Sequence, residues 1–227
     1  MPILILLLLA SISLVESGFI PKKYELTLTP EFFGDNSFTG NTKIHVDVTG
    51  SVKEFDLKVS KDITVERVQF WQANTIYRDS PDTIGQTAEI KKDAKNNKVH
   101  VILLASITKE DITKVGYIDI DYKGKAGKQG ANKGLFLYNP ADYETNLKND
   151  KVIHLFPILE DVAAPLTLSV ITPYRAGVET KLKEGEHNDV NGKQLISNNF
   201  NSGTEKIKIS NISFKVKAPR APELQSN

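Results

Sequence analysis

Cysteine is absent from the 227 residues of this sequence. Disulfide bonds, cysteine-ligated metal sites and thiol catalysis are therefore excluded, and stability has to come from a hydrophobic core. Aromatic residues are also scarce, at 8% of the chain, and the single tryptophan is Trp71. Because Trp71 stands at the end of a predicted strand, we expect it at the edge of the core rather than in a ligand-binding platform.

An excess of charge of either sign is lacking too. Lysine and arginine number 29, aspartate and glutamate 28, and the formal net charge is +1. Nucleic acids and anionic membrane surfaces are bound by proteins with a large basic excess or basic blocks, so neither is an expected partner. With 40% hydrophobic and 25% charged residues, the composition is typical of a globular protein that buries a sizeable core.

Long apolar runs are limited to the first residues of the chain. The stretch Ile3 to Leu9 is uninterrupted and is followed by small residues up to a candidate cleavage site after Ser17. The run is much shorter than the ~20 residues that a membrane-spanning helix needs. We therefore predict a secretory signal peptide at residues 1–17, with a membrane anchor as the alternative. The mature protein is expected to be secreted, with no stable membrane insertion after cleavage.

The sequence is rich in strand-type alternation. Tyr24–Leu28, Ile44–Val48 and Phe55–Val59 each place apolar side chains at every second position. Such alternation gives a strand one face for a core and one face for water. Similar patterns predict further strands at Ile63–Val65, Val68–Phe70, Val99–Leu103, Ile118–Tyr122, Leu135–Leu137 and Leu166–Val170.

Two features of the C-terminal third concern the connections between strands. Asn191-Gly192 is the best two-residue hairpin signal in the sequence. Further on, Ile209 and Phe214 lie on opposite phases of the alternation, which predicts a β-bulge near Ser210-Asn211. The sequon Asn211-Ile212-Ser213 overlaps this bulge and predicts N-glycosylation at Asn211, with access limited if the strand is bulged there.

Helical periodicity is almost absent. The one short candidate, Thr108–Gly116, begins like a capping box and predicts a single turn. Many short strands with regular turns predict an all-β fold, a large antiparallel β-sandwich or curved sheet. No linker or repeat divides the chain, so we expect one domain over residues 18–217 and a flexible tail over residues 218–227.

Motifs of catalysis are missing. A zinc peptidase typically presents H-E-x-x-H on one helix, yet no two of His45, His100, His154 and His187 lie within four residues of each other. The first two fall on the polar phase of strands, and Glu186–Asp189 around the last is expected to be a loop. The G-x-S-x-G elbow and the phosphate-binding loop are absent as well. We predict no catalytic residue, no metal ligand and no cofactor.

Two charged segments are weaker candidates for a site. Residues 122–134 hold glycines and four lysines, and we expect a mobile hairpin loop there, with weak contact to anions as the functional alternative. Glu160 and Asp161 are adjacent, so in an extended chain their side chains point to opposite faces. We interpret them as a turn into the next strand rather than as an acid–base pair. The lysines of the first segment are those at 123, 125, 128 and 133.

The order of landmarks resembles the N-terminal domain of M1-type zinc aminopeptidases, the aminopeptidase N family. "PKKYELTLTPEFFGDNSFTGNTKIHVDV", Pro21–Val48, is similar to that domain's P-x-x-Y-x-L-x-L-x-P and F-x-G segments. "GYIDIDYKGKAGKQGANKGLFLY", Gly116–Tyr138, is similar to a later segment, and Phe156-Pro157 falls where the family has A-F-P-C-F-D-E-P-A. The resemblance covers most of residues 20–217 and implies a large antiparallel β-sheet structure that flanks an active site in the family. The family's H-E-x-x-H and G-x-M-E-N motifs do not occur here.

The resemblance also assigns one part of the family's substrate site to this region, a T-Q-F-E-like segment whose Glu helps to bind the substrate's free amine. Counting back from Phe156-Pro157, the segment is "TNLK". Thr145 is kept, the Gln position is Asn146, and the Glu position is Lys148. A cation in that place repels an ammonium group.

These observations favour a secreted, non-catalytic, aminopeptidase-N-like domain that acts as a binding or interaction module, or pseudo-peptidase. The partner, a protein or peptide, and the oligomeric state are not specified by the sequence. The alternative is a truncated piece of an M1 zinc aminopeptidase, which would hydrolyse peptides only with the missing catalytic domain. A small-molecule carrier is a third reading and requires an apolar cavity inside the sheets.

Overall fold

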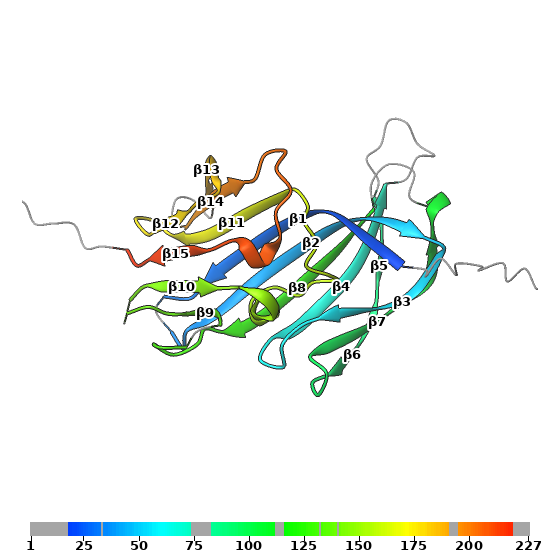
Figure 1. The fold of residues 1–227 in the computed structure, drawn as a ribbon, viewed down its shortest axis with the longest axis horizontal. Coiled ribbons are helices and arrows are strands. Elements are labelled where there is room, and N and C mark those ends of the chain that lie inside the picture. Colours follow the sequence, from blue (N-terminus) through cyan, green and yellow to red (C-terminus); the bar gives the residue numbers. More distant parts are fainter. Residues whose placement is uncertain are drawn as a thin grey trace, which may run out of the picture.

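A computed structural model describes residues 18–219 except 33, 74–82, 112–115, 132, 140 and 191–194 (Figure 1). The predicted signal peptide, the Asn191-Gly192 turn and most of the predicted tail lie outside the described residues. Among the described residues, no helix has the length and apolar character needed to cross a membrane. The regular secondary structure of the described residues is almost entirely β-strand, as the alternation predicts.

Eight strands form a large, twisted sheet. Its strand order is β13-β14-β11-β1-β2-β8-β4-β5, and its neighbours are antiparallel except for β1 and β11, which are parallel. The expected all-β class is confirmed, but the sheet is mixed rather than wholly antiparallel. Parallel pairing of two strands so far apart in the sequence depends on a long crossover that local turn signals do not encode. The strands are β1 (Gly18–Pro30), β2 (Ser37–Thr49), β4 (Thr64–Ala73), β5 (Thr83–Thr87), β8 (Gly116–Lys125), β11 (Leu166–Pro173), β13 (Lys183–Val190) and β14 (Leu195–Asn201).

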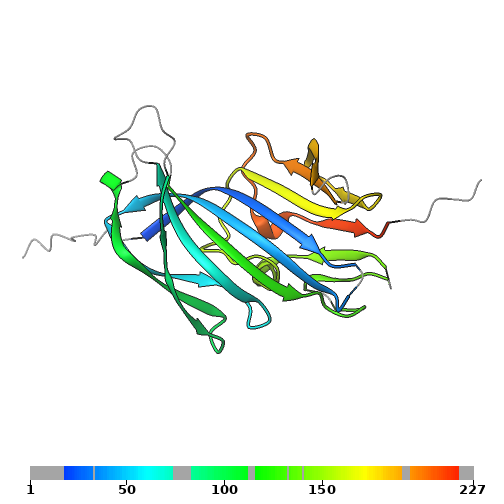
Figure 2. The ribbon, with the colours of Figure 1, turned by 180° about the vertical axis from the view of Figure 1, so that it is seen from behind.

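Two smaller sheets lie on one face of the large sheet, near its two ends (Figures 1 and 2). A four-stranded sheet has the order β12-β15-β10-β9, and a three-stranded sheet has the order β3-β7-β6. Three short 3-10 helices, η1 to η3, complete the described elements. Their bounds are β3 (Ser51–Lys58), β6 (Glu89–Asp93), β7 (Lys98–Thr108), η1 (Lys109–Asp111), β9 (Gly134–Leu137), β10 (Tyr143–Asn146), η2 (Asn149–His154), β12 (Gly177–Thr180), η3 (Ile209–Asn211) and β15 (Phe214–Lys217).

The core lies between the large sheet and the two smaller ones. Strand register places Leu166, Tyr24, Ile44, Ile118 and Phe70 in one row across the large sheet. All five are at most 2% exposed and belong to one hydrophobic cluster that also includes residues of both smaller sheets. Burying side chains of this size stabilises the fold by about 1.5–3 kcal/mol each, so the alternation read from the sequence is the main determinant of the architecture.

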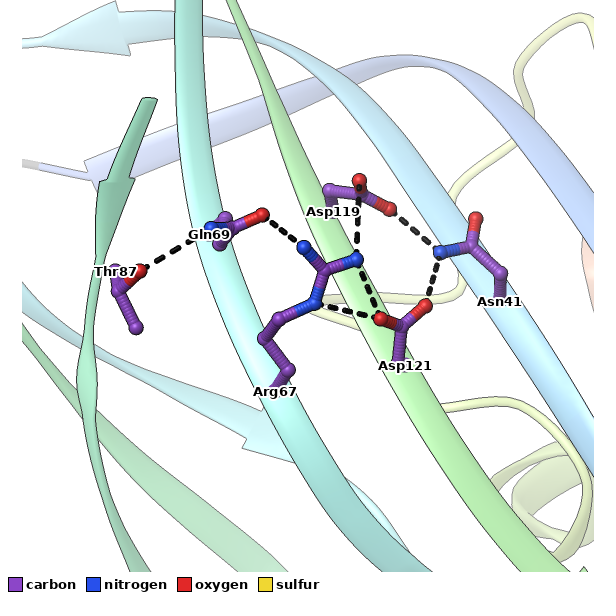
Figure 3. A network of polar contacts seen from close by, with 6 residues as sticks. All are labelled: Asn41, Arg67, Gln69, Thr87, Asp119 and Asp121. Carbon is purple, nitrogen blue, oxygen red and sulfur yellow. Dashed lines mark hydrogen bonds and ion pairs between the residues drawn. The ribbon is translucent and has the colours of Figure 1, made fainter. Parts of the chain in front are cut away.

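The opposite face of the large sheet is polar. Asn41 donates from Nδ2 to Asp119 Oδ1 at 2.6 Å and to Asp121 Oδ1 at 2.7 Å, and Arg67 Nε donates to Asp121 Oδ2 at 2.6 Å (Figure 3). Arg67 also donates to Gln69 on its own strand. These bonds tie β2, β8 and β4 together across the outer surface, where alternate positions of each strand face away from the core.

Local predictions near the C-terminus need two corrections. The predicted bulge at Ser210-Asn211 is wrong, because these residues belong to η3. With three residues per turn, η3 turns Ile209 and Ile212 to the same side, and both are buried. The 3-10 turn therefore accounts for the shift in apolar alternation between Ile209 and Phe214, without a β-bulge. The predicted loop at Glu186–Asp189 is also wrong, because β13 runs through it and pairs with β14.

Candidate functional site

A surface pocket of about 690 Å³ opens beside the four-stranded sheet. We call it the β10–η3 pocket, because β10 with the residues after it and η3 with the residues after it provide most of its lining. Phe136, Leu147 and Ile212 contribute apolar surface, while amide, hydroxyl and charged groups surround them. The volume lies within the range of about 300–1,000 Å³ that is usual for ligand sites.

Thr145, at the bottom of this pocket, has a structural role. Its side chain is buried, and its Oγ1 accepts a hydrogen bond from the Phe214 N–H at 2.9 Å and donates one to the Phe214 carbonyl at 3.0 Å. The β10–β15 ladder pairs Tyr143 with Val216 and Glu144 with Lys215. The Thr145 hydroxyl therefore continues this pairing by one position and holds η3 and its following residues against β10.

Lys148 lies on the rim of the pocket, and its ammonium group has no ion-pair partner among the described residues. It is exposed, directly precedes η2, and its backbone N–H donates to Asn146 Oδ1 at 3.3 Å. The next residue, Asn149, has a left-handed backbone with φ of 58°, a conformation that asparagine adopts more readily than most residues. This turn fixes the backbone of Lys148 beside the pocket, so the T-N-L-K segment chosen by resemblance does line a cavity.

The charge of the lining is mainly positive. Glu144, the acid of the lining among the described residues, forms an ion pair with Lys215 at 3.3 Å. Lys148 and Lys181 are both exposed, and neither has an ion-pair partner within the described part of the chain. The sequence does not predict Lys181 as part of the site. Nothing in its local pattern indicates that the residue after β12 lines the same pocket as β10.

The predicted glycosylation residue, Asn211, is exposed on the rim of the same pocket. It is the last residue of η3, and Ser213 of the sequon is exposed as well, while Ile212 between them is 6% exposed. Access is therefore not restricted by a bulged strand. Modification of Asn211 stays a prediction.

Glu160 and Asp161 lie in an irregular segment that leads into β11. The Glu160 carbonyl accepts a hydrogen bond of 2.5 Å from the Tyr24 hydroxyl, and Asp161 Oδ1 accepts one of 3.2 Å from the Ser210 N–H. Burial, with the nearby Asp161 charge, raises the pKa of Tyr24 well above its usual range. These contacts anchor the segment to β1 and η3, which is a structural task and not acid–base chemistry.

The four histidines and three of the four lysines of residues 122–134 lie beside carboxylates. No group of three or more histidine, aspartate and glutamate side chains in the described ranges is placed to hold a metal ion. Three of the four lysines of residues 122–134 are paired, which leaves little charge there for anions. The pairs are His45–Glu25, His100–Asp56, His154–Asp62, His187–Glu184, Lys123–Glu66, Lys125–Asp35 and Lys133–Asp62.

Comparison with known proteins identifies the fold. No family model matches the sequence, and no curated protein is similar to it by sequence. Among solved structures, a point mutant of the M1 zinc metallopeptidase from Deinococcus radiodurans bound to a Tyr-Ser-Ala substrate matches with a TM-score of 0.66 and 15% identity, over 88% of this chain and 42% of that one. The same mutant in a second structure matches with a TM-score of 0.64 and 16% identity, with the same coverage. The chain therefore has the fold of a part of this metallopeptidase and spans about two fifths of its length.

Proposed function

We propose that this chain, with the fold of one part of an M1 metallopeptidase, is a secreted, non-catalytic module that binds a protein or peptide at the β10–η3 pocket. The observation that carries the proposal is Lys148 on the rim of that pocket, where the aminopeptidase N resemblance gives the amine-binding glutamate. A pocket that presents a lysine where the resemblance gives a glutamate is suited to binding a ligand other than an amine.

The reversal matters energetically. Two like charges about 4 Å apart repel by ~1 kcal/mol when fully solvated and by several times more when partly buried. An ammonium group at the family's position would therefore bind less well here by a factor of at least about five, in addition to the loss of the attraction to glutamate.

Absence of aminopeptidase activity is the first test. Purified chain, supplied with zinc, is incubated with aminoacyl-anilide substrates beside an active M1 aminopeptidase as a positive control. We expect no release of the anilide above the rate in buffer. Release that depends on zinc and stops with a chelator would overturn the proposal.

Secretion and modification are tested in a eukaryotic cell line that expresses residues 1–227. We expect the protein in the medium, with Gly18 as its first residue, and we expect Asn211→Gln and Ser213→Ala each to remove the same mass of glycan. Retention in the cell, or an uncleaved N-terminus, contradicts the secretory assignment. If wild type carries no more glycan mass than the two variants, glycosylation of Asn211 is contradicted while the secretory assignment is unaffected.

A second candidate function, a portion of a longer peptidase, is favoured by the 42% coverage of the matched enzyme. The mass of the native protein after deglycosylation separates the two. The binding-module proposal predicts a mass at or below the 25.2 kDa of this chain. A product much larger than this, with zinc-dependent hydrolysis, would establish the longer enzyme.

A further inference from the structure

We infer that the β10–η3 pocket recognises a carboxylate group of a short peptide, so that its selectivity is opposite in sign to that of an amine-binding site. The inference rests on the proposed function, since it names the ligand chemistry of the same pocket. It follows from two lysines that have no ion-pair partner among the described residues, from the hydrogen bonds that hold their backbones, and from the other groups of the lining.

Lys148 and Lys181 enter the lining from different elements, one before η2 and one after β12, and both keep their charge free of partners among the described residues. Glu144 is neutralised by Lys215 at 3.3 Å. A concave surface with two uncompensated cations attracts an anion more strongly than either cation does alone.

Hydrogen bonds hold the backbone at both lysines. The Thr180 hydroxyl donates to the Ser213 carbonyl at 3.0 Å and accepts from the Leu182 N–H at 3.3 Å, so the turn that carries Lys181 is fastened to the segment after η3. On the other side, the Lys148 carbonyl accepts from the Lys151 N–H at 3.2 Å. Both side chains are exposed and accessible to a ligand. Because both backbones are already held in place, less conformational entropy is lost on binding.

Neutral polar groups and apolar side chains complete the lining. Asn149, Asn211 and Ser213 line the pocket and offer neutral amide and hydroxyl donors, which complement the oxygens of a carboxylate. Leu147 and Ile212 supply apolar surface for the side chain or backbone next to it. The ligand proposed for this pocket is a peptide, whose anionic groups are the C-terminal carboxylate and acidic side chains, and so a carboxylate is the expected anion.

A peptide carboxylate has two sources, the C-terminus and an acidic side chain, and four alanine tetrapeptides distinguish them. One is blocked at both ends, one has a free C-terminal carboxylate, one is blocked but contains a glutamate, and one has a free N-terminal ammonium with a C-terminal amide. Affinities for the full chain are measured by calorimetry at low salt and at about 0.5 M salt, where the Debye length falls to a few ångströms.

We expect carboxylate peptides to bind more tightly than the blocked peptide and the ammonium peptide to bind least, with the preference reduced at high salt. Lys148→Gln and Lys181→Gln should each weaken carboxylate binding about threefold, and the double variant about tenfold. Lys53→Gln is the matched control, because Lys53 is exposed on β3 of the three-stranded sheet and should leave affinity unchanged.

Two outcomes overturn the inference in different ways. If the blocked or the ammonium peptide binds as tightly as the carboxylate peptides, the ligand class is wrong while the pocket stands as a binding site. If none of the four peptides binds, or if binding is indifferent to both lysine substitutions, the assignment of peptide binding to this pocket falls as well.

Discussion

Replacing Thr145 by valine tests whether the pocket is built by the hydroxyl that joins β10 to β15. Valine has nearly the shape of threonine but has no hydroxyl, so the substitution removes both bonds to Phe214, of 2.9 and 3.0 Å. Phe214 is only 2% exposed. Its backbone N–H and C=O would therefore lose their hydrogen-bond partner at a place where water cannot replace it.

The magnitude follows from these two groups. A buried backbone group left unpaired costs about 1–3 kcal/mol, so the loss of both partners in Thr145→Val should lower the free energy of unfolding by about 2–6 kcal/mol. Thr145→Ser is the matched control, because it keeps the hydroxyl and removes one methyl group, at a cost of about 1 kcal/mol. The valine variant should be the less stable of the two by at least about 1 kcal/mol.

Urea unfolding followed by far-ultraviolet circular dichroism measures the difference, and hydrogen exchange of the Phe214 amide shows whether the loss is local. We expect a lower midpoint and much faster exchange in Thr145→Val than in Thr145→Ser. The reasoning is refuted if the valine variant is as stable as wild type, or if the serine variant is the less stable one.

Two further predictions concern the rest of the fold. The hydrogen bond with His45 lowers the pKa of the Glu25 carboxyl to about 2 in the folded protein. The ionised Glu25 therefore stabilises the fold at pH values above its unfolded pKa, and this stabilisation is lost as the pH falls through about 2. Urea midpoints at several pH values should show that Glu25→Gln flattens the acid dependence, and an unchanged slope contradicts this. At Gly134, with φ of +61°, an added Cβ would lie 2.7 Å from the His154 carbonyl oxygen, whereas at Gly130, with φ of +84°, it meets nothing within 4 Å. Gly134→Ala should therefore lose about 2 kcal/mol or more and Gly130→Ala about 1 kcal/mol in thermal unfolding, and equal losses contradict the clash.

The sequence predicts the strands whose two faces meet different surroundings. Tyr24–Leu28 and Ile118–Tyr122 alternate because every second residue enters the core, and the structure places them in β1 and β8 as expected. Glu186–Asp189 is predicted to be a loop but belongs to β13, whose residues are polar and largely exposed. Pairing with β14 at the sheet edge forms this strand without an apolar pattern. Strand order also escapes the sequence, since the parallel β1–β11 pair depends on contacts across most of the chain.

The candidate site was predictable in part for a similar reason. The resemblance selected Thr145, Asn146 and Lys148, which are close together in the chain and do line one pocket. Asn211 was noticed as a sequon, but its place beside Lys148 depends on η3 and on the Thr145–Phe214 bonds. Lys181 carried no sequence signal, because an exposed lysine becomes part of a site only through the residues that the fold brings next to it.

The most direct test of the central claim is to map peptide contacts by nuclear magnetic resonance. Backbone amide signals of isotope-labelled chain are followed as the blocked tetrapeptide with a glutamate is added. The account predicts that the largest shifts occur at Asn146–Asn149 and at Ile209–Ser213, and that Lys148→Glu strongly reduces them at the same peptide concentration. Shifts confined to the outer face of the large sheet, around Asn41 and Asp119, or shifts unaffected by Lys148→Glu, would contradict it.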